Sequence, residues 1–253
     1  MTLRLEADAV FTVDHANTVL APGAVEITDG VISWVGDPWQ VPAASGTTVQ
    51  RLGGILMPGL VNCHGHSPMT LVRSAGDGLP LDRWLSEAVW PREARMHDDD
   101  VYWGMMLGAA ELLGYGITTT CEQYRHPVAV AEAALDSGIR TLYTVAILDM
   151  AHTGPANTWE MLLEGACELF DRANGKEGRF LVGFGPHAAY TVPPHALRAI
   201  ALEAQRRDAL FQIHLSETAA ECAVVRDRYG MSAPALLASL GAFDGRALAA
   251  HAA

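Results

Sequence analysis

Two histidines one residue apart, His64 and His66, follow a short apolar segment and open onto a polar loop. Because alternate residues of a strand point to the same face, both imidazoles can reach one cation. A His-x-His pair alone is weak evidence, since a chance surface or core pair has the same spacing. Its position carries more weight, because α/β barrels place their chemistry where a strand stops and a loop begins. The pair therefore predicts a metal-binding position at a strand end.

Three further histidines, His187, His214 and His251, stand at the ends of later apolar segments. In a closed parallel barrel, the carboxyl ends of the strands meet at one mouth. Neutral imidazoles gathered there suit zinc or another borderline divalent metal, and open coordination leaves room for a reactive water. A single histidine in an apolar segment is more often a hydrogen-bonded core residue. We therefore interpret His64, His66, His214 and His251 as a set.

Glu217 lies three residues after His214, just past a histidine-bearing segment. A carboxylate there could accept a proton from water and pass it to a leaving group. An exposed acid on the following helix is equally consistent, because Glu217 and Glu221 are four residues apart and would share a face. The residues alone leave both interpretations open.

Weaker signals come from the loop after the first strand and from the other histidines. Trp84 and Glu93 lie in that loop. Trp84, Trp90 and Trp103 could form substrate walls, although aromatic residues on helices are more often part of a core. We expect the remaining histidines, which fall in loops or at helix starts, to be solvated or capping: His15, His97, His126, His152 and His195.

The elements that must position these residues follow two patterns. Strand-like segments separated by turn signals predict a small β-rich domain over residues 1–56. From residue 57 to 253, short apolar segments alternate with helix-like ones, the pattern of βα units in a parallel sheet. We predict an α/β fold, a TIM-like (β/α)8 barrel of which six strands can be counted: 60–64, 117–122, 140–148, 180–186, 210–215 and 248–251. Strands seven and eight are expected beyond residue 253, because six strands would leave a barrel edge unpaired.

Composition narrows the class of protein. Half of the 253 residues are apolar, enough for a large core, and a formal net charge of -12 leaves no basic stripe for a phosphate backbone. No apolar segment approaches the roughly 20 residues of a membrane span, and no signal peptide is evident. The four cysteines are widely spaced and include no Cys-x-x-Cys pair, which favours reduced thiols over a disulfide framework or a zinc knuckle. We expect a cytoplasmic protein with a small-molecule substrate and no nucleic-acid or membrane partner; a homo-oligomer stays open.

These residues, in this order, resemble the amidohydrolase superfamily, and more closely its 5-methylthioadenosine/S-adenosylhomocysteine deaminases. The resemblance covers nearly the whole chain. It rests on MPGLVNCHGHSPMTLVRS at 57–74, on Trp84 with Pro91 and Glu93, on LVGFGPHAAYT at 181–191, on IHLSET at 213–218 and on AAH at 249–251.

The resemblance implies a metal-dependent hydrolase barrel with one divalent metal per subunit, zinc being expected and iron the alternative. An aspartate from beyond residue 253 would complete the ligands. Glu217 would shuttle protons and contact the substrate, with His251 beside it as ligand and catalytic residue. His187 would lie beside the substrate, Glu93 would bind ribose hydroxyls and Trp84 would line the site. The implied ligands are His64, His66, His214 and His251.

The implied reaction is hydrolytic deamination of an adenine-type nucleoside, such as methylthioadenosine, S-adenosylhomocysteine or adenosine, with release of ammonia. Val145 stands where these deaminases often carry an arginine, which leaves recognition of a homocysteine carboxylate open. Aminofutalosine, triazines and other cyclic amidines are alternative substrates. A catalytically silent barrel that only binds a ligand or partner is the alternative from another class, because the expected aspartate is not in the chain.

Overall fold

The computed structural model describes residues 1–41, 43–149 and 158–253, and the chain divides into two compact units, Met1–Gly59 and Leu60–Ala253. The first unit is a five-stranded sheet in which β5 pairs with β1 in parallel and the other pairings are antiparallel. Asp29 and Gly30 have φ values of 50° and 82°, as a two-residue hairpin turn requires, so residues 24–35 form two strands. The strands are β1 (Thr2–Phe11), β2 (Val19–Leu20), β3 (Gly23–Thr28), β4 (Val31–Gly36) and β5 (Thr48–Leu56).

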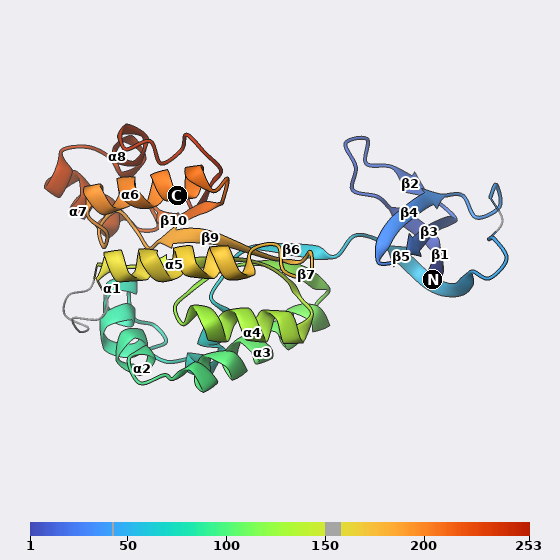
Figure 1. Ribbon diagram of the computed structural model, residues 1–253, viewed down its shortest axis with the longest axis horizontal. Coiled ribbons are helices and arrows are strands. Elements are labelled where there is room, and N and C mark those ends of the chain that lie inside the picture. The colour runs from blue at the N-terminus through green and yellow to red at the C-terminus, as the bar shows by residue number, and fades with distance from the viewer. Residues whose placement is uncertain (42, 150–157) are drawn as a thin grey trace. The chain divides into compact units, whose positions relative to one another are not determined.

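The second unit contains a six-stranded parallel sheet (Figure 1). Each strand pairs with its neighbours in sequence, in the order β11-β10-β9-β8-β7-β6, as expected of consecutive right-handed βα units. All six strands predicted from the sequence are present, and the α/β barrel type is confirmed. Their bounds are β6 (Leu60–Gly65), β7 (Ile117–Tyr124), β8 (Arg140–Ile147), β9 (Phe180–Pro186), β10 (Phe211–Leu215) and β11 (Ala247–His251).

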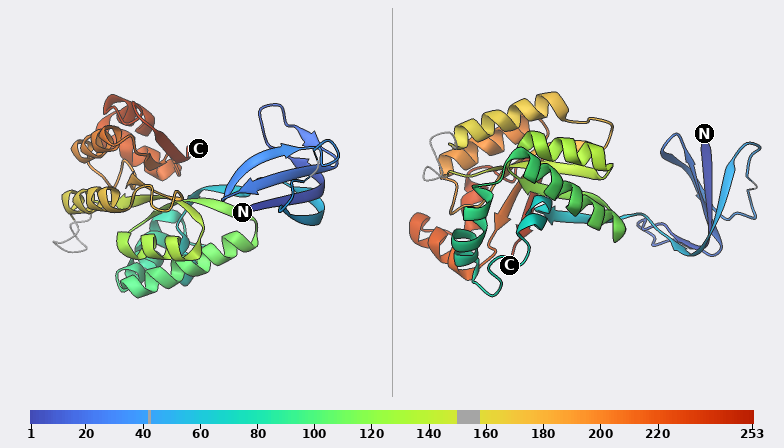
Figure 2. Two further views of the ribbon diagram at one scale, coloured as in Figure 1. Left: turned by 45° about the vertical axis from the view of Figure 1, so that its right-hand side comes forward. Right: turned by 90° about the horizontal axis from the view of Figure 1, so that it is seen from below.

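Helices connect these strands and pack around the outside of the sheet (Figures 1 and 2). Alanine-rich helix faces and apolar strand residues such as Val145, Phe184 and Ile213 form one continuous core. The link from β6 to β7 holds η1 (Ser67–Val72), α1 (Leu81–Arg83), η2 (Trp84–Val89), α2 (Trp90–Glu93) and α3 (Asp98–Gly114). The later helices are α4 (Pro127–Ser137), α5 (Trp159–Ala173), α6 (Pro194–Arg206), α7 (Ala219–Tyr229) and α8 (Ala233–Ser239).

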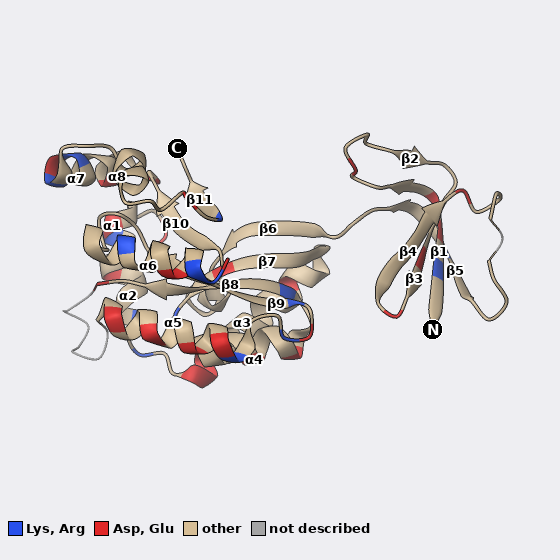
Figure 3. Cartoon of the chain, turned by 45° about the horizontal axis from the view of Figure 1, so that its top comes forward, with Lys and Arg blue, Asp and Glu red and all other residues tan. Residues whose placement is uncertain are grey.

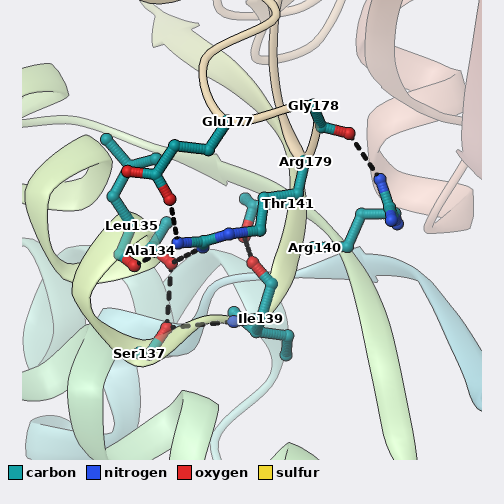
Figure 4. A network of polar contacts seen from close by, with 9 residues as sticks. All are labelled: Ala134, Leu135, Ser137, Ile139, Arg140, Thr141, Glu177, Gly178 and Arg179. Carbon is teal, nitrogen blue, oxygen red and sulfur yellow. Dashed lines mark hydrogen bonds and ion pairs between the residues drawn. The ribbon is translucent and has the colours of Figure 1, made fainter. Parts of the chain in front are cut away.

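A polar network fixes the ends of the barrel elements that lie away from the predicted site (Figure 4). Gly138 ends α4 with a φ of 81°, and the guanidinium of Arg179 donates to the carbonyls of Ala134 and Leu135 at 3.3 and 2.7 Å. Arg179 is also paired with Glu177. These bonds satisfy carbonyl groups that the last turn of a helix leaves unpaired. The starts of β8 and β9 are thereby held to α4, whereas the predicted site residues follow the other ends of the strands.

Charged residues lie on several helices, with a row of acidic residues along α5, and lysine and arginine form no continuous stripe (Figure 3). Acidic residues outnumber lysine and arginine by 29 to 17. Among the described helices, none has both the length and the apolar character needed to cross a membrane. The four cysteines are free thiols in the structure.

Candidate functional site

Three of the predicted histidines come together inside the curled sheet. One nitrogen from each of His64, His66 and His214 lies within 4.8 Å of the others. His64 belongs to β6 and His214 to β10, and β7, β8 and β9 separate these strands in the sheet order. The two rings have centroids 4.7 Å apart, so the sheet must curl to bring them across the interior. These three residues therefore meet at one mouth of the barrel, as the sequence predicted.

Hydrogen bonds decide which ring nitrogens face the centre. His66 Nδ1 lies 2.6 Å from the carbonyl oxygen of Gln123, and His214 Nδ1 lies 2.9 Å from that of His187. Because a carbonyl oxygen only accepts, both Nδ1 atoms donate, and in the neutral rings each Nε2 carries a lone pair. The two Nε2 atoms are 3.3 Å apart. Lone pairs at that separation repel unless a cation lies between them.

The donor set fits a divalent metal ion. Four-coordinate zinc binds imidazole nitrogens at about 2.05 Å, which places two such nitrogens about 3.3 Å apart. The Nε2 atoms of His66 and His214 have that separation. Imidazole is also a preferred ligand for zinc, copper, iron and nickel. The geometry thus supports a divalent metal at this centre.

His251, the fourth predicted ligand, stands at the rim of the cluster. Its ring centroid is 5.2 Å from that of His64 and 5.4 Å from that of His214, but it is not among the three residues whose nitrogens group within 4.8 Å. Its Nε2 atom is 3.7 Å from Oε1 of Glu217. The structure therefore brings His251 to the same mouth and places it beside the predicted proton carrier.

Glu217 and Glu221 occupy different environments. Glu217 precedes α7 and lines the cavity above the histidines, whereas Glu221 is buried in the first turn of that helix. The Glu221 carboxylate accepts hydrogen bonds from the backbone N–H groups of Ser216 and Glu217, at 3.2 and 2.8 Å. Burial raises the pKa of Glu221, although these bonds oppose the shift. The two acids do not form an exposed pair on one helix face; Glu221 holds the turn that carries Glu217.

A cavity of about 670 Å³ lies over the histidine cluster. All of the residues predicted to contact a substrate line it: Trp84, Glu93, His187 and Glu217. Several apolar side chains form the rest of the wall, among them Leu85, Trp90 and Leu148. The cavity is of the size that small-molecule sites have, with polar groups at a few points of an apolar surface.

Glu93 is held in place by two neighbours. Its Oε1 atom accepts a hydrogen bond of 2.6 Å from the Tyr124 hydroxyl, and its Oε2 atom lies 4.0 Å from Nη2 of Arg125. Burial, followed by the negative charge of Glu93, raises the pKa of Tyr124, so the hydroxyl remains a donor. The Oε2 atom has no partner closer than the guanidinium among the described residues, which leaves it free to accept from a ligand.

Two cavity residues that directly follow β7 were not anticipated from the sequence. His126 was expected to be solvated or capping, but it lines the cavity, and its Nδ1 atom lies 2.7 Å from Oδ1 of Asp98. Its side chain makes no capping hydrogen bond to α4, so the capping role is wrong, although the side chain is 26% exposed. Arg125 lines the same wall. Both follow the carboxyl end of β7 directly, the same signal that identified the other site residues. His152 lies outside the described residues.

Val145 does not line the cavity. It is 2% exposed and packs in the core between the strands and helices, whereas Ala146 and Leu148 from the same segment line the cavity. Among the described residues of the cavity wall, Arg125 is the one arginine or lysine.

Burial keeps three histidines of this site neutral. It lowers the pKa of His64 and of His187 to about 4 and that of His214 to about 2, and the neighbouring imidazoles add to the shift. All three are therefore neutral at pH 7. Neutral imidazole is the form that binds a metal ion.

We expect the metal-free protein to lose stability as the pH falls from about 6.5 to about 4. In this window the unfolded histidines bind protons that the folded state excludes, so the free energy of unfolding rises with pH and falls on acidification. Each histidine that stays neutral in the folded state lowers the free energy of unfolding by about 2 kcal/mol at pH 5 relative to pH 7. Urea unfolding at the two pH values measures the loss, which should be smaller in His187→Asn. Equal stability at both would contradict the expectation.

Comparison with known proteins places this site in a family. The model of the amidohydrolase family matches residues 55–253. A 5-methylthioadenosine/S-adenosylhomocysteine deaminase from Symbiobacterium thermophilum is 40% identical over 252 residues, covering 98% of this chain and 57% of its own length. A second protein of that name, from Pelotomaculum thermopropionicum, is 35% identical and has the same coverage, 98% and 57%. The chain thus spans a little over half the length of these relatives.

Solved structures agree with this assignment. An adenosine deaminase from Xanthomonas campestris with bound zinc is 32% identical, with a TM-score of 0.89 over 98% of this chain and 56% of that one. An atrazine chlorohydrolase from Arthrobacter aurescens, complexed with zinc, has a TM-score of 0.87 at 22% identity, over 98% of this chain and 60% of that one, and shows the shared fold alone. With the family match over most of its length and a histidine cluster at the mouth of its barrel, this chain belongs to the amidohydrolase family.

Proposed function

We propose that the protein is a hydrolytic deaminase of adenine-type nucleosides. The observation that carries this proposal is the single cavity that holds both the histidine cluster and the carboxylate of Glu217. The similarity to deaminases at 35–40% identity supports the same activity. The chain spans 57% of the length of those relatives, so the activity is proposed for the whole protein.

We further propose one zinc ion per subunit at this centre, held by His64, His66 and His214 with His251 beside them. The Xanthomonas structure with bound zinc supports the choice of metal. A divalent metal there would supply the Lewis acidity that brings the pKa of water toward about 7.

The residues around the centre would then carry the proton transfers. Glu217 accepts a proton from the attacking water, whose oxygen bonds to the ring carbon that bears the amine. Glu217 then returns the proton to the amine nitrogen, the C–N bond breaks and ammonia leaves. The remaining hydroxyl proton moves to the adjacent ring nitrogen, so an amidine becomes a lactam. His251, 3.7 Å from Glu217, orients its carboxylate. His187, whose Nδ1 is 2.9 Å from the Thr191 hydroxyl, is proposed to contact the purine beside the reacting carbon.

Glu93 is proposed to bind the ribose hydroxyls, because its Oε2 atom faces no closer protein donor and a carboxylate can accept two hydrogen bonds. Trp84 would form part of the wall, since its indole N–H is already bonded to the carbonyl of Ala75 at 2.8 Å and its ring lines the cavity. Arg125, the one long cation on the described wall, is partly neutralised by Glu93. We therefore propose that adenosine and methylthioadenosine are better substrates than the carboxylate-bearing S-adenosylhomocysteine.

An ammonia-release screen tests the proposed function. The substrates are adenosine, methylthioadenosine, S-adenosylhomocysteine, aminofutalosine and a chlorinated triazine. We expect ammonia and a change in adenine absorbance with the first two, loss of both signals after treatment with a metal chelator, and their return when zinc is added. Turnover of the triazine alone would favour the cyclic-amidine alternative. Full metal occupancy without turnover of any substrate would favour the silent barrel.

A further inference from the structure

A buried amide and a buried hydroxyl stand behind the metal centre. Gln212 precedes His214 by two residues in β10, Thr144 lies in β8, and both side chains are fully buried. Nε2 of Gln212 lies 2.8 Å from Nδ1 of His64, and Oε1 of Gln212 lies 3.2 Å from Oγ1 of Thr144. The Thr144 hydroxyl is also 3.0 Å from the backbone carbonyl of Glu122. A continuous chain of polar contacts thus leads from β7, through β8 and β10, to His64.

The orientation of the amide decides what His64 can do. Nitrogen and oxygen of a side-chain amide have the same outline, so their positions follow from the partners they meet. If the Gln212 nitrogen faces His64, Nδ1 of His64 must accept, and the proton of the neutral ring lies on Nε2. That proton would occupy the nitrogen left for a metal ion.

The opposite orientation satisfies every group in the chain. The Gln212 oxygen then accepts from Nδ1–H of His64, and its nitrogen donates to the Thr144 hydroxyl oxygen. The Thr144 hydroxyl proton is free to go to the Glu122 carbonyl, which can only accept. His66 and His214 are already held in this way by carbonyls, those of Gln123 and His187.

We propose that Gln212 is a positioning residue that takes this second orientation and holds His64 with its proton on Nδ1. Its Nε2 lone pair then faces the centre, as those of His66 and His214 do. Thr144 is needed because an amide, unlike a backbone carbonyl, can turn over. When the Thr144 hydroxyl proton goes to the Glu122 carbonyl, the hydroxyl oxygen is left to accept from the Gln212 nitrogen, which favours this orientation. The role rests on the metal centre of the proposed function, but the tautomer belongs to the metal-free protein and can be measured without turnover.

Nuclear magnetic resonance tests the tautomer directly. In metal-free protein carrying ¹⁵N-labelled histidine, long-range ¹H–¹⁵N spectra at pH 7 show which ring nitrogen bears the proton, and the signals of His64 are those missing from His64→Gln. We expect the proton of His64 on Nδ1. A proton on Nε2 overturns the proposal, whatever the activity of the enzyme.

Zinc affinity tests the consequence. Competition with a chromophoric chelator gives the dissociation constant for Zn²⁺ in two variants of Gln212. Gln212→Met removes the acceptor and should weaken zinc binding about 10- to 100-fold, as loss of an outer-shell partner does. Gln212→Glu keeps an acceptor for Nδ1–H and should bind zinc more tightly than the methionine variant.

A role limited to packing predicts the reverse order, because methionine fills the space without charge while a buried carboxylate carries a desolvation cost. The reverse order, or equal affinities, would rule out the positioning role. Where either variant fails to fold by circular dichroism, Thr144→Val decides: it should give a mixture of both His64 tautomers, and an unchanged single tautomer would contradict the part assigned to Thr144. If the tautomer and the zinc affinities are as expected but no ammonia is released, the result counts against the proposed function and not against the role of Gln212.

Discussion

Replacing Glu217 by glutamine is expected to reduce turnover by about 10²- to 10⁴-fold while leaving the metal content unchanged. The amide keeps the size of the side chain but cannot accept the proton of water. Glu217 lines the cavity, and its Oε1 atom is 3.7 Å from His251 and not part of the group formed by the three clustered histidines. Ammonia release measured beside the metal-to-protein ratio separates the two effects.

The matched control is Glu132→Gln, which makes the same change on the exposed surface of α4. Its activity and metal content should equal those of the unaltered protein. Retained turnover in Glu217→Gln would remove Glu217 from the reaction. A parallel loss of metal would show instead that the carboxylate supports the centre rather than the proton transfers.

Replacing His214 by alanine is expected to leave less than about half an equivalent of metal per chain, with loss of turnover. His214 is 6% exposed, and its Nε2 atom faces that of His66 at 3.3 Å, so no other described side chain can take its place without a rearrangement. The variant also removes the bond from Nδ1 to the carbonyl of His187, but that carbonyl keeps the backbone N–H of residue 214 at 3.0 Å, so the lost bond costs about 0.5–1.5 kcal/mol of stability. Elemental analysis of protein purified without chelator measures the metal.

His195→Ala is the matched control, because His195 is exposed on α6 and does not line the cavity. It should retain metal and activity. A stability measurement by urea unfolding shows whether His214→Ala is folded when its metal is counted. A folded variant that still binds a full equivalent would exclude His214 as a ligand.

Much of the barrel unit could be predicted because its signals are local. Most of its strands are short, largely apolar segments, and the helices between them have recognisable ends, such as Pro127 and Gly138 around α4. Parallel strands joined by helices place their carboxyl ends on one side, whatever the sequence in between. That topological rule is why His64, His66 and His214 could be grouped before their distances were known.

The roles of individual polar residues were harder to predict. His126 has the same position after its strand as the grouped histidines, but its place at the start of a helix suggested a capping role. Glu221 is four residues from Glu217, which suggested a shared exposed face. The burial of Glu221 and its bonds to the backbone of the preceding turn depend on how α7 packs, which helical spacing does not reveal.

The sequence by itself determined the order of the strands, the residue types at their ends and hence the kind of chemistry that the barrel can carry, because strand periodicity and the βα connection are local properties of the chain. Only the tertiary structure decided which nitrogens of those residues face one another. The contact between Gln212 and His64 joins residues 148 positions apart, and it exists because the sheet curls until β10 lies across the interior from β6. Carbonyls at neighbouring strand ends set the tautomers of His66 and His214, and the contact across the interior is the one that we propose for His64. The tautomers determine whether the histidines can share a metal ion.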